Sequence, residues 1–240
     1  MTAAVLLAHV VSRTSLGVIA VTDHDDLAGA IDAWDRARDL PGATPRVIVG
    51  TEVTAAWGKH VVALFPSAPF PAKPLPRFRS VRDTVALIHD LGGIAVAPHP
   101  ATPLVPSLGE GDIRRLMDGT ARLDAIEVCT GALRGRRREA RMRRLARELG
   151  IAEVGSSDAH HLAHVGAAVT HFDGAGIADL VAAITGRTTV AGWGQSTRVG
   201  PRALLAQAGR AWAVRPAREL REVMRHPRFR ERLRRLASGN

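Results

Sequence analysis

The stretch VRDTVALIHDLGGIAVAPHP, residues 81–100, contains one complete unit of the fold that this sequence predicts. Its first apolar side chains recur every three or four residues, the spacing of one helix face, at Val81, Val85, Ile88 and Leu91. Gly92 and Gly93 then end the helix, and the short apolar run 94–98 reads as a buried strand. Because His99 follows directly, the stretch predicts a helix leading into a strand with a histidine at its carboxyl end.

The same alternation of helical patterns and short apolar runs extends in both directions from this unit. The other runs, bounded mostly by Gly, Pro or Asp, cover 18–22, 47–51, 60–65, 123–129, 151–155 and 167–172. The other helical patterns cover 27–39, 112–117, 136–149 and 177–184. This alternation predicts an α/β fold with a mainly parallel sheet, open or closed. The segment 53–59 is too short for a helical crossover, so its two flanking runs are predicted to pair as an antiparallel hairpin.

Acidic and histidine side chains follow the predicted strands at their carboxyl ends, and one histidine opens the return strand of the hairpin. These residues are Asp23, His24, Glu52, His60, His99, Asp158 and His160. In parallel α/β folds such ends meet on one face, where ligands bind. Nitrogen and carboxylate ligands without sulfur suit Zn, Mn or Fe. Each residue alone could be an ordinary hydrogen-bonded side chain. The four histidines, Glu52 and Asp158 are six candidate ligands on one face, however, and together they favour a shared metal site.

Length and composition limit the class of protein. The 240 residues suit one large domain, or a domain with an appendage, and 46% apolar residues are too many for a disordered chain. The single cysteine, Cys129, excludes an intrachain disulfide and a cysteine zinc cluster. No apolar run approaches the ~20 residues that span a membrane. A short, apolar start without a basic leader predicts a cytoplasmic protein.

Positive charge is concentrated in two arginine-rich segments, while the whole chain has a net charge of +10. Residues 134–148 hold eight arginines and two glutamates, and residues 196–240 hold twelve arginines and three glutamates. We therefore predict a main domain over 1–195 and a basic helical extension over 196–240, cut by Pro216 and Pro227. Such segments can contact nucleic acid, although a solvated helix face is the simpler interpretation. The sequence leaves the oligomeric state open.

Six motifs in order resemble the PHP family, the polymerase-and-histidinol-phosphatase superfamily of metal-dependent phosphoesterases. They are Thr22-Asp23-His24, Gly50-Thr51-Glu52, His60 with the following apolar strand, Ala97-Pro98-His99-Pro100, Ile126-Glu127-Val128 and Gly155-Ser156-Ser157-Asp158-Ala159-His160. They cover roughly residues 16–195 and look most like the stand-alone branch that hydrolyses nucleoside 3′,5′-bisphosphates and short 5′-phosphorylated oligonucleotides. The resemblance implies a distorted seven-stranded (β/α) barrel with up to three divalent ions at its carboxyl face.

The resemblance also implies a division of the ligands. Glu52, His60 and His99 would form one complete set, whereas Glu52 with Asp158, and His24 with His160, would each be half of a set. The family opens with a strand that carries an H-x-H motif, and this chain begins with Met1-Thr2-Ala3-Ala4 in a helical pattern. The first barrel strand and three expected ligands are therefore missing from this sequence, either because the strand lies upstream of Met1 or because the chain is a degenerate member, and we expect one or two ions to bind.

The expected function is hydrolysis of a phosphate ester of a nucleotide or short oligonucleotide by metal-activated water. Catalytic roles are expected for Asp23, which would orient His24, and for Glu52 and Asp158. Glu127 is expected in the wall of the site. Arg134 and Arg136 are candidates for holding a substrate phosphate, although a solvated helix start explains them equally well.

Three alternatives remain open at this point. A catalytically impaired PHP remnant could bind nucleic acid or another partner, and a histidinol-phosphate phosphatase would have the same family motifs. The Asp23-His24-Asp25 sequence also looks like the D-x-D motif of haloacid-dehalogenase phosphatases, which use an aspartate nucleophile. That class needs Thr or Val where this chain has Leu27, and a later lysine, for which only Lys59 and Lys73 are available.

Overall fold

The computed structural model describes residues 1–194 apart from 41, 43–44, 103–105 and 132–135, together with the backbone but not the side chain of Arg136. The extension predicted over 196–240 lies outside the described residues, so it stays a prediction. The helices are α1 (Ala3–Arg13), α2 (Ala28–Arg38), α3 (Val81–Asp90), α4 (Glu110–Met117), α5 (Arg136–Leu149) and α6 (Ile177–Gly186). The strands are β1 (Val18–Val21), β2 (Arg46–Thr54), β3 (His60–Phe65), β4 (Ile94–Ala97), β5 (Ala125–Thr130), β6 (Ala152–Ser156), β7 (Ala168–His171) and β8 (Val190–Trp193).

Strands β1 to β6 form one mixed sheet in sequence order, which confirms the predicted α/β fold. The pairs β1–β2, β4–β5 and β5–β6 are parallel, whereas β3 runs antiparallel to both β2 and β4. The predicted hairpin is therefore correct, with Thr54 opposite His60 at its last pair. Five strands consequently point the same way, so their carboxyl ends and the start of β3 lie at one end of the sheet.

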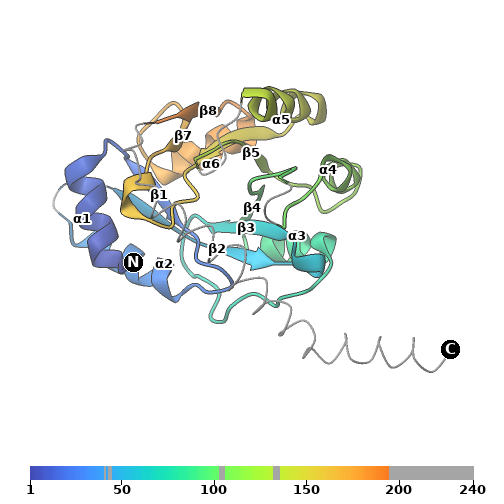
Figure 1. Cartoon of the computed structure of the whole chain (residues 1–240). Coiled ribbons are helices and arrows are strands. Elements are labelled where there is room, and N and C mark those ends of the chain that lie inside the picture. Colours follow the sequence, from blue (N-terminus) through green and yellow to red (C-terminus); the bar gives the residue numbers. More distant parts are fainter. Residues whose placement is uncertain (41, 43–44, 103–105, 132–135, 195–240) are drawn as a thin grey trace. The chain divides into compact units, whose positions relative to one another are not determined.

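The sheet curls like half of a barrel, with helices on its outer side (Figure 1). Helices α1 and α2 lie near β1 and β2, whereas α4 and α5 lie toward β4 and β5 (Figure 1). Strands β7 and β8 form a separate antiparallel pair close to β6. A Cβ at Gly155 would lie 2.2 Å from the carbonyl oxygen of Val169, so this crossing requires glycine. The patterns did not predict β8.

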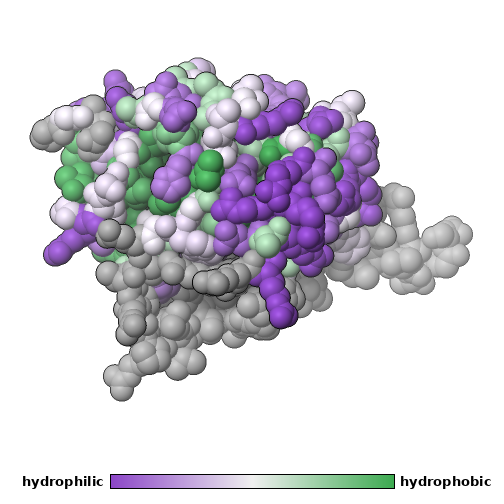
Figure 2. All heavy atoms as spheres, turned by 90° about the horizontal axis from the view of Figure 1, so that it is seen from above, coloured by the Kyte–Doolittle hydropathy of each residue, from purple (hydrophilic) through white to green (hydrophobic). Residues whose placement is uncertain are grey.

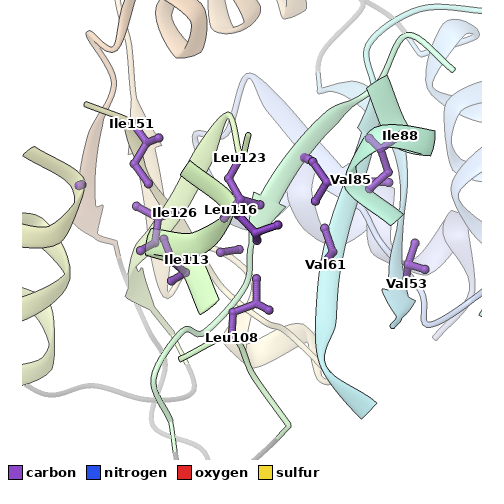
Figure 3. Close-up of a cluster of buried hydrophobic side chains, with 14 of the residues drawn as sticks. Val53, Val61, Val85, Ile88, Leu108, Ile113, Leu116, Leu123, Ile126 and Ile151 are labelled. Carbon is purple, nitrogen blue, oxygen red and sulfur yellow. The ribbon is translucent and has the colours of Figure 1, made fainter. Parts of the chain in front are cut away.

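The main core lies between the middle strands and the helices α3 and α4 (Figure 3). Val53 and Val61 on the hairpin face Val85 and Ile88 of α3, as the helical spacing of that segment predicts. Burying one such side chain contributes about 1.5–3 kcal/mol. This core fixes β2 to β5, the strands whose ends carry most of the candidate ligands.

The turn from α3 to β4 follows the sequence prediction closely. The Ser80 hydroxyl accepts a hydrogen bond from the Asp83 backbone N–H at 3.0 Å and caps the start of α3. Gly92, with φ of 73°, ends the helix in a left-handed conformation. A Cβ at Gly93 would lie 2.8 Å from Phe65, so the entry into β4 has no room for a side chain there. The strand that ends before His99 is thereby held in register.

Within residues 1–194, apart from the gaps given above, no helix is long and apolar enough to cross a membrane. The expected cytoplasmic location stays a prediction.

Candidate metal centre

Glu52 lies buried near the end of β2, with three imidazole rings around its carboxylate. Oε1 is 2.7 Å from Nδ1 of His60 and 3.0 Å from Nε2 of His99, and Oε2 is 3.1 Å from Nε2 of His24. The rings of His24 and His60 have centroids 5.0 Å apart, and those of His60 and His99 are 5.6 Å apart. Three histidines predicted from separate parts of the sequence thus converge on the carboxylate of a fourth predicted residue, Glu52.

The segment after β1 brings His24 to this centre by continuing the pairing with β2. Glu52 N–H donates to the Asp23 carbonyl and Asp25 N–H donates to the Glu52 carbonyl, both at 3.1 Å. The Asp25 carboxylate then accepts from the backbone N–H and the hydroxyl of Thr54, each at 2.7 Å. Asp26 accepts from the first N–H groups of α2. In this run of acidic residues, Asp25 and Asp26 therefore hold the backbone that positions His24.

Glu127 positions His99 from the neighbouring strand. Its Oε2 accepts a hydrogen bond from the His99 backbone N–H at 2.8 Å and from the Thr130 hydroxyl at 3.1 Å. Glu127 is buried on β5, which agrees with its predicted place in the wall of the site. The specific contact with His99 was not predicted, because it depends on the register between β4 and β5, which the motifs do not reveal.

The centre combines negative charge with burial. Burial alone would raise the pKa of Glu52, but the contacts with His60 and His99 and the charge of His24 outweigh it and hold that pKa well below its ordinary value. Burial lowers the pKa of His99, yet the hydrogen bond and charge of Glu52 raise it to about 8. Burial raises the pKa of Glu127 despite its contact with His99. Glu52 is therefore the main anionic group of the cluster.

The donor set fits a divalent cation. His60 Nε2 and His99 Nδ1 are buried and have no hydrogen-bond partner among the described residues. Unpaired buried ring nitrogens are costly, and a ligand can offset that cost. The ligand atoms of His24, Glu52 and His60 lie within 4.8 Å of one another. Ligands bound to one ion at 2.0–2.1 Å in a tetrahedral site are about 3.3 Å apart, so the spacing around Glu52 is close to that of a bound set.

Backbone strain is concentrated at the same end of the sheet. Asp25, His99 and Asp158 have φ values of 53°, 29° and 46°, and Ala101 has 53°. Non-glycine residues in this region cost of order 1–3 kcal/mol, and such conformations gather at binding and catalytic sites. Three of these residues follow β1, β4 and β6, where the sequence predicts the site.

The remaining predicted residues lie at the border of the site or outside the residues that the structure describes. Asp158 acts electrostatically on His99 and Glu127, and its carboxylate is 3.6 Å from Nδ1 of the more exposed His160. His24 lies against Glu52, and its expected shared ligand set with His160 stays a prediction. Asp23 is exposed, and its carboxylate faces Gly29 in α2, where a Cβ would lie 2.5 Å from Oδ2. Arg134 and the side chain of Arg136 are not among the described parts of the chain.

Two sequence comparisons bear on the family. Residues 137–189 match a family described as PHP-associated. An uncharacterized protein of Methanocaldococcus jannaschii is 28% identical over 119 residues, which cover 50% of this chain and 61% of that relative. The match thus spans less than two thirds of the curated relative. The family match supports the resemblance to the PHP superfamily and leaves the branch within it undecided, and the uncharacterized relative adds neither a family nor a function.

Solved structures show the same fold. A two-domain protein from Bacteroides vulgatus that contains a predicted PHP-like metal-dependent phosphoesterase aligns with a TM-score of 0.58 at 19% identity, over 83% of this chain and 62% of that one. The lesion-specific endonuclease PfuEndoQ from Pyrococcus furiosus aligns with a TM-score of 0.54 at 15% identity. The alignment covers 75% of this chain and 50% of the endonuclease. At these identities the comparison establishes the PHP-type barrel fold, and the function has to be argued from the site.

Proposed function

We propose that this chain is a metal-dependent phosphoesterase that hydrolyses a phosphate ester of a nucleotide or short oligonucleotide. The observation that supports this most strongly is the buried Glu52 carboxylate with His24, His60 and His99 around it. Those four residues would hold a divalent ion. When bound, such an ion supplies Lewis acidity toward a phosphate oxygen and activates a water as nucleophile.

The chain's own residues would orient and support this centre. Glu127 fixes His99 through the backbone, which determines where the imidazole points. Asp158 lies at the border of the site, where its partly exposed carboxylate can accept a proton or complete a ligand set. The haloacid-dehalogenase alternative loses support, because Asp25, the second aspartate of the D-x-D sequence, is bound by Thr54 and Arg77.

A nucleotide substrate is supported by Trp57, at the tip of the hairpin that carries Glu52 and His60. Trp57 is 78% exposed and has a left-handed φ of 64°, so a large aromatic side chain is presented at a strained position at the end of the sheet that carries the centre. The tip is anchored because Lys59 Nζ lies 2.7 Å from the Asp112 carboxylate at the start of α4. Stacking of one base on an aromatic side chain contributes about 1–3 kcal/mol, which favours a nucleotide over a small aliphatic phosphate.

The test is release of inorganic phosphate by the Mn- or Zn-loaded chain from three substrates: a nucleoside 3′,5′-bisphosphate, histidinol phosphate and glycerol phosphate. We expect the bisphosphate to have the highest kcat/KM. Trp57→Ala should lower that value about 5- to 100-fold while leaving glycerol phosphate within twofold. Preference for histidinol phosphate would identify the biosynthetic phosphatase instead. Salt-sensitive nucleic-acid binding without any hydrolysis would contradict the proposal and favour the binding module.

A further inference from the structure

Arg138, in the first turn of α5, reaches back to the candidate metal centre. Its Nε donates to the Pro100 carbonyl and its Nη2 donates to the Thr130 hydroxyl, both at 3.3 Å. Pro100 directly follows His99, and the Thr130 hydroxyl donates to Glu127, which holds the His99 backbone. The guanidinium therefore lies against the residue that follows His99 and against the hydroxyl that binds Glu127, on the side of the centre formed by the end of β5.

The charge of Arg138 has no carboxylate partner within ion-pair distance among the described residues. Its two recorded acceptors are neutral and long, and they use two of the five N–H donors of a guanidinium. Arg143 in the same helix shows the usual arrangement, because it contacts Glu139, Glu153 and the Ala191 carbonyl. A partly buried cation without a counter-ion is costly unless a ligand supplies one.

Burial lowers the pKa of Arg138, and the negative charge of Glu127 opposes that effect. A guanidinium nevertheless keeps its charge at neutral pH, since its ordinary pKa lies far above neutrality. Glu127 itself is already bound by the His99 N–H and the Thr130 hydroxyl. The unused donors of Arg138 are thus available to an anion that enters the site from outside.

We propose that Arg138 binds the phosphoryl group of the substrate through its remaining N–H donors. This inference rests on the proposed phosphoesterase function and names the residue that recognises the phosphate. The planar fork of an arginine matches two oxygens of a phosphate at once, which a lysine cannot do. The sequence suggested the same role for Arg134 and Arg136, whose side chains lie outside the described residues, so for them it stays a prediction.

Arg138 could instead serve only to tie α5 to the turn after His99, and the experiment has to separate these roles. Inorganic phosphate is titrated calorimetrically into the full chain after metal loading and removal of free metal. The variants are Arg138→Gln, Arg138→Lys and, as a matched control, Arg137→Gln, which changes the exposed neighbouring arginine. Metal content and the thermal unfolding midpoint are measured for each. If Arg138 only holds α5 to the turn after His99, its replacement should change the metal content or the unfolding midpoint without a specific loss of phosphate affinity.

We expect Arg138→Gln to weaken phosphate binding roughly 10- to 100-fold, which is the range for losing charge-assisted hydrogen bonds. Arg138→Lys should keep the fold and the metal and weaken binding roughly fivefold, because the charge remains but the fork is lost. Arg137→Gln should remain within twofold. These variants should also raise KM for the phosphate ester in the same order.

Binding that is equal to wild type in Arg138→Gln, with metal and fold intact, would overturn the inference. If Arg138→Gln loses the fold or the metal, Arg138→Lys decides, and a lysine variant that binds phosphate like wild type would also overturn it. Phosphate binding that depends on Arg138 in a chain that hydrolyses no ester would support the inference and refute the proposed function. A wild-type chain that binds no phosphate would refute the inference directly.

Discussion

The carboxyl end of the sheet and the outer face of α4 and α5 both concentrate charged residues, but they satisfy that charge in different ways. On the helices, Arg114 pairs with Glu148 at 2.6 Å, and Arg141 pairs with Glu110, so cations and anions from the two helices neutralise each other. Figure 2 shows hydrophilic residues gathered over this side of the molecule. At the sheet end, one buried carboxylate faces three imidazoles, two of which have a ring nitrogen without a partner.

The difference shows that burial and convergence, more than the number of charged residues, distinguish a site from a solvated surface. Water and mobile side chains satisfy an exposed arginine at little cost, so exposed ion pairs contribute little. Water is excluded from Glu52 and His99, so their arrangement has to be maintained by the surrounding strands. The predictions below change matched residues in the two regions, beginning with the largest expected effect.

Glu52→Gln should reduce kcat/KM for phosphate-ester hydrolysis by about 1,000-fold or more, because the shared carboxylate ligand of the centre is lost. The matched change on the helices, Glu110→Gln, should leave kcat/KM within twofold. Initial rates of phosphate release by the metal-loaded variants provide the measurement. Equal losses in the two variants would remove the distinction between the regions.

Glu127→Gln should weaken divalent-metal affinity about 10- to 100-fold. The substitution replaces the charged carboxylate that accepts the His99 backbone N–H with a neutral amide. Glu148→Gln, which breaks a pair between α4 and α5, should leave affinity unchanged. Titration against a competing chelator measures both values. Unchanged affinity in Glu127→Gln would show that the position of His99 does not depend on this contact.

The metal-free chain should lose stability as the pH rises from 6 to 9. His99 has a pKa raised from the ordinary 6.5 to about 8, so its contribution is complete below pH 6.5 and disappears as the pH passes through about 8. The difference corresponds to about 2 kcal/mol in the free energy of unfolding. Urea unfolding in EDTA checks this, and His99→Gln should not show the loss. A wild-type stability that rises over this range would contradict the assignment.

Arg141→Ala should have the smallest effect, because its pair with Glu110 is exposed. Exposed pairs contribute about 0.2–1 kcal/mol, which moves the thermal midpoint of a chain of this size by less than about 4 °C. Differential scanning calorimetry at low and high salt provides the check. A larger drop would mean that the helix surface is a structural network, and not a set of solvated pairs.

Much of the fold could be predicted because most of the strands and helices have a local signal. The segment 81–100 shows this, since its helical spacing, its paired glycines and its strand all occur in the structure. The candidate ligands could be predicted for a topological reason: parallel strands bring their carboxyl ends together. His24, Glu52, His60 and His99 therefore meet although up to 75 residues separate them in the sequence.

The parts that could not be predicted depend on three-dimensional register. The bond between Glu127 and His99 and the contacts of Arg138 link side chains on different elements, and no local pattern encodes them. Strand β8, which no pattern predicted, pairs with β7 in an antiparallel ladder. The expected pairing of His24 with His160 rested on the family resemblance, and whether it forms around an ion stays a prediction.

Metal stoichiometry of the purified chain tests the central claim most directly. Elemental analysis after dialysis should find at least one divalent transition-metal ion per wild-type chain. The ion should be absent from Glu52→Gln and retained in Glu110→Gln. No bound ion in the wild type, or equal amounts in wild type and Glu52→Gln, would contradict the claim that the buried cluster at the end of the sheet is a metal centre.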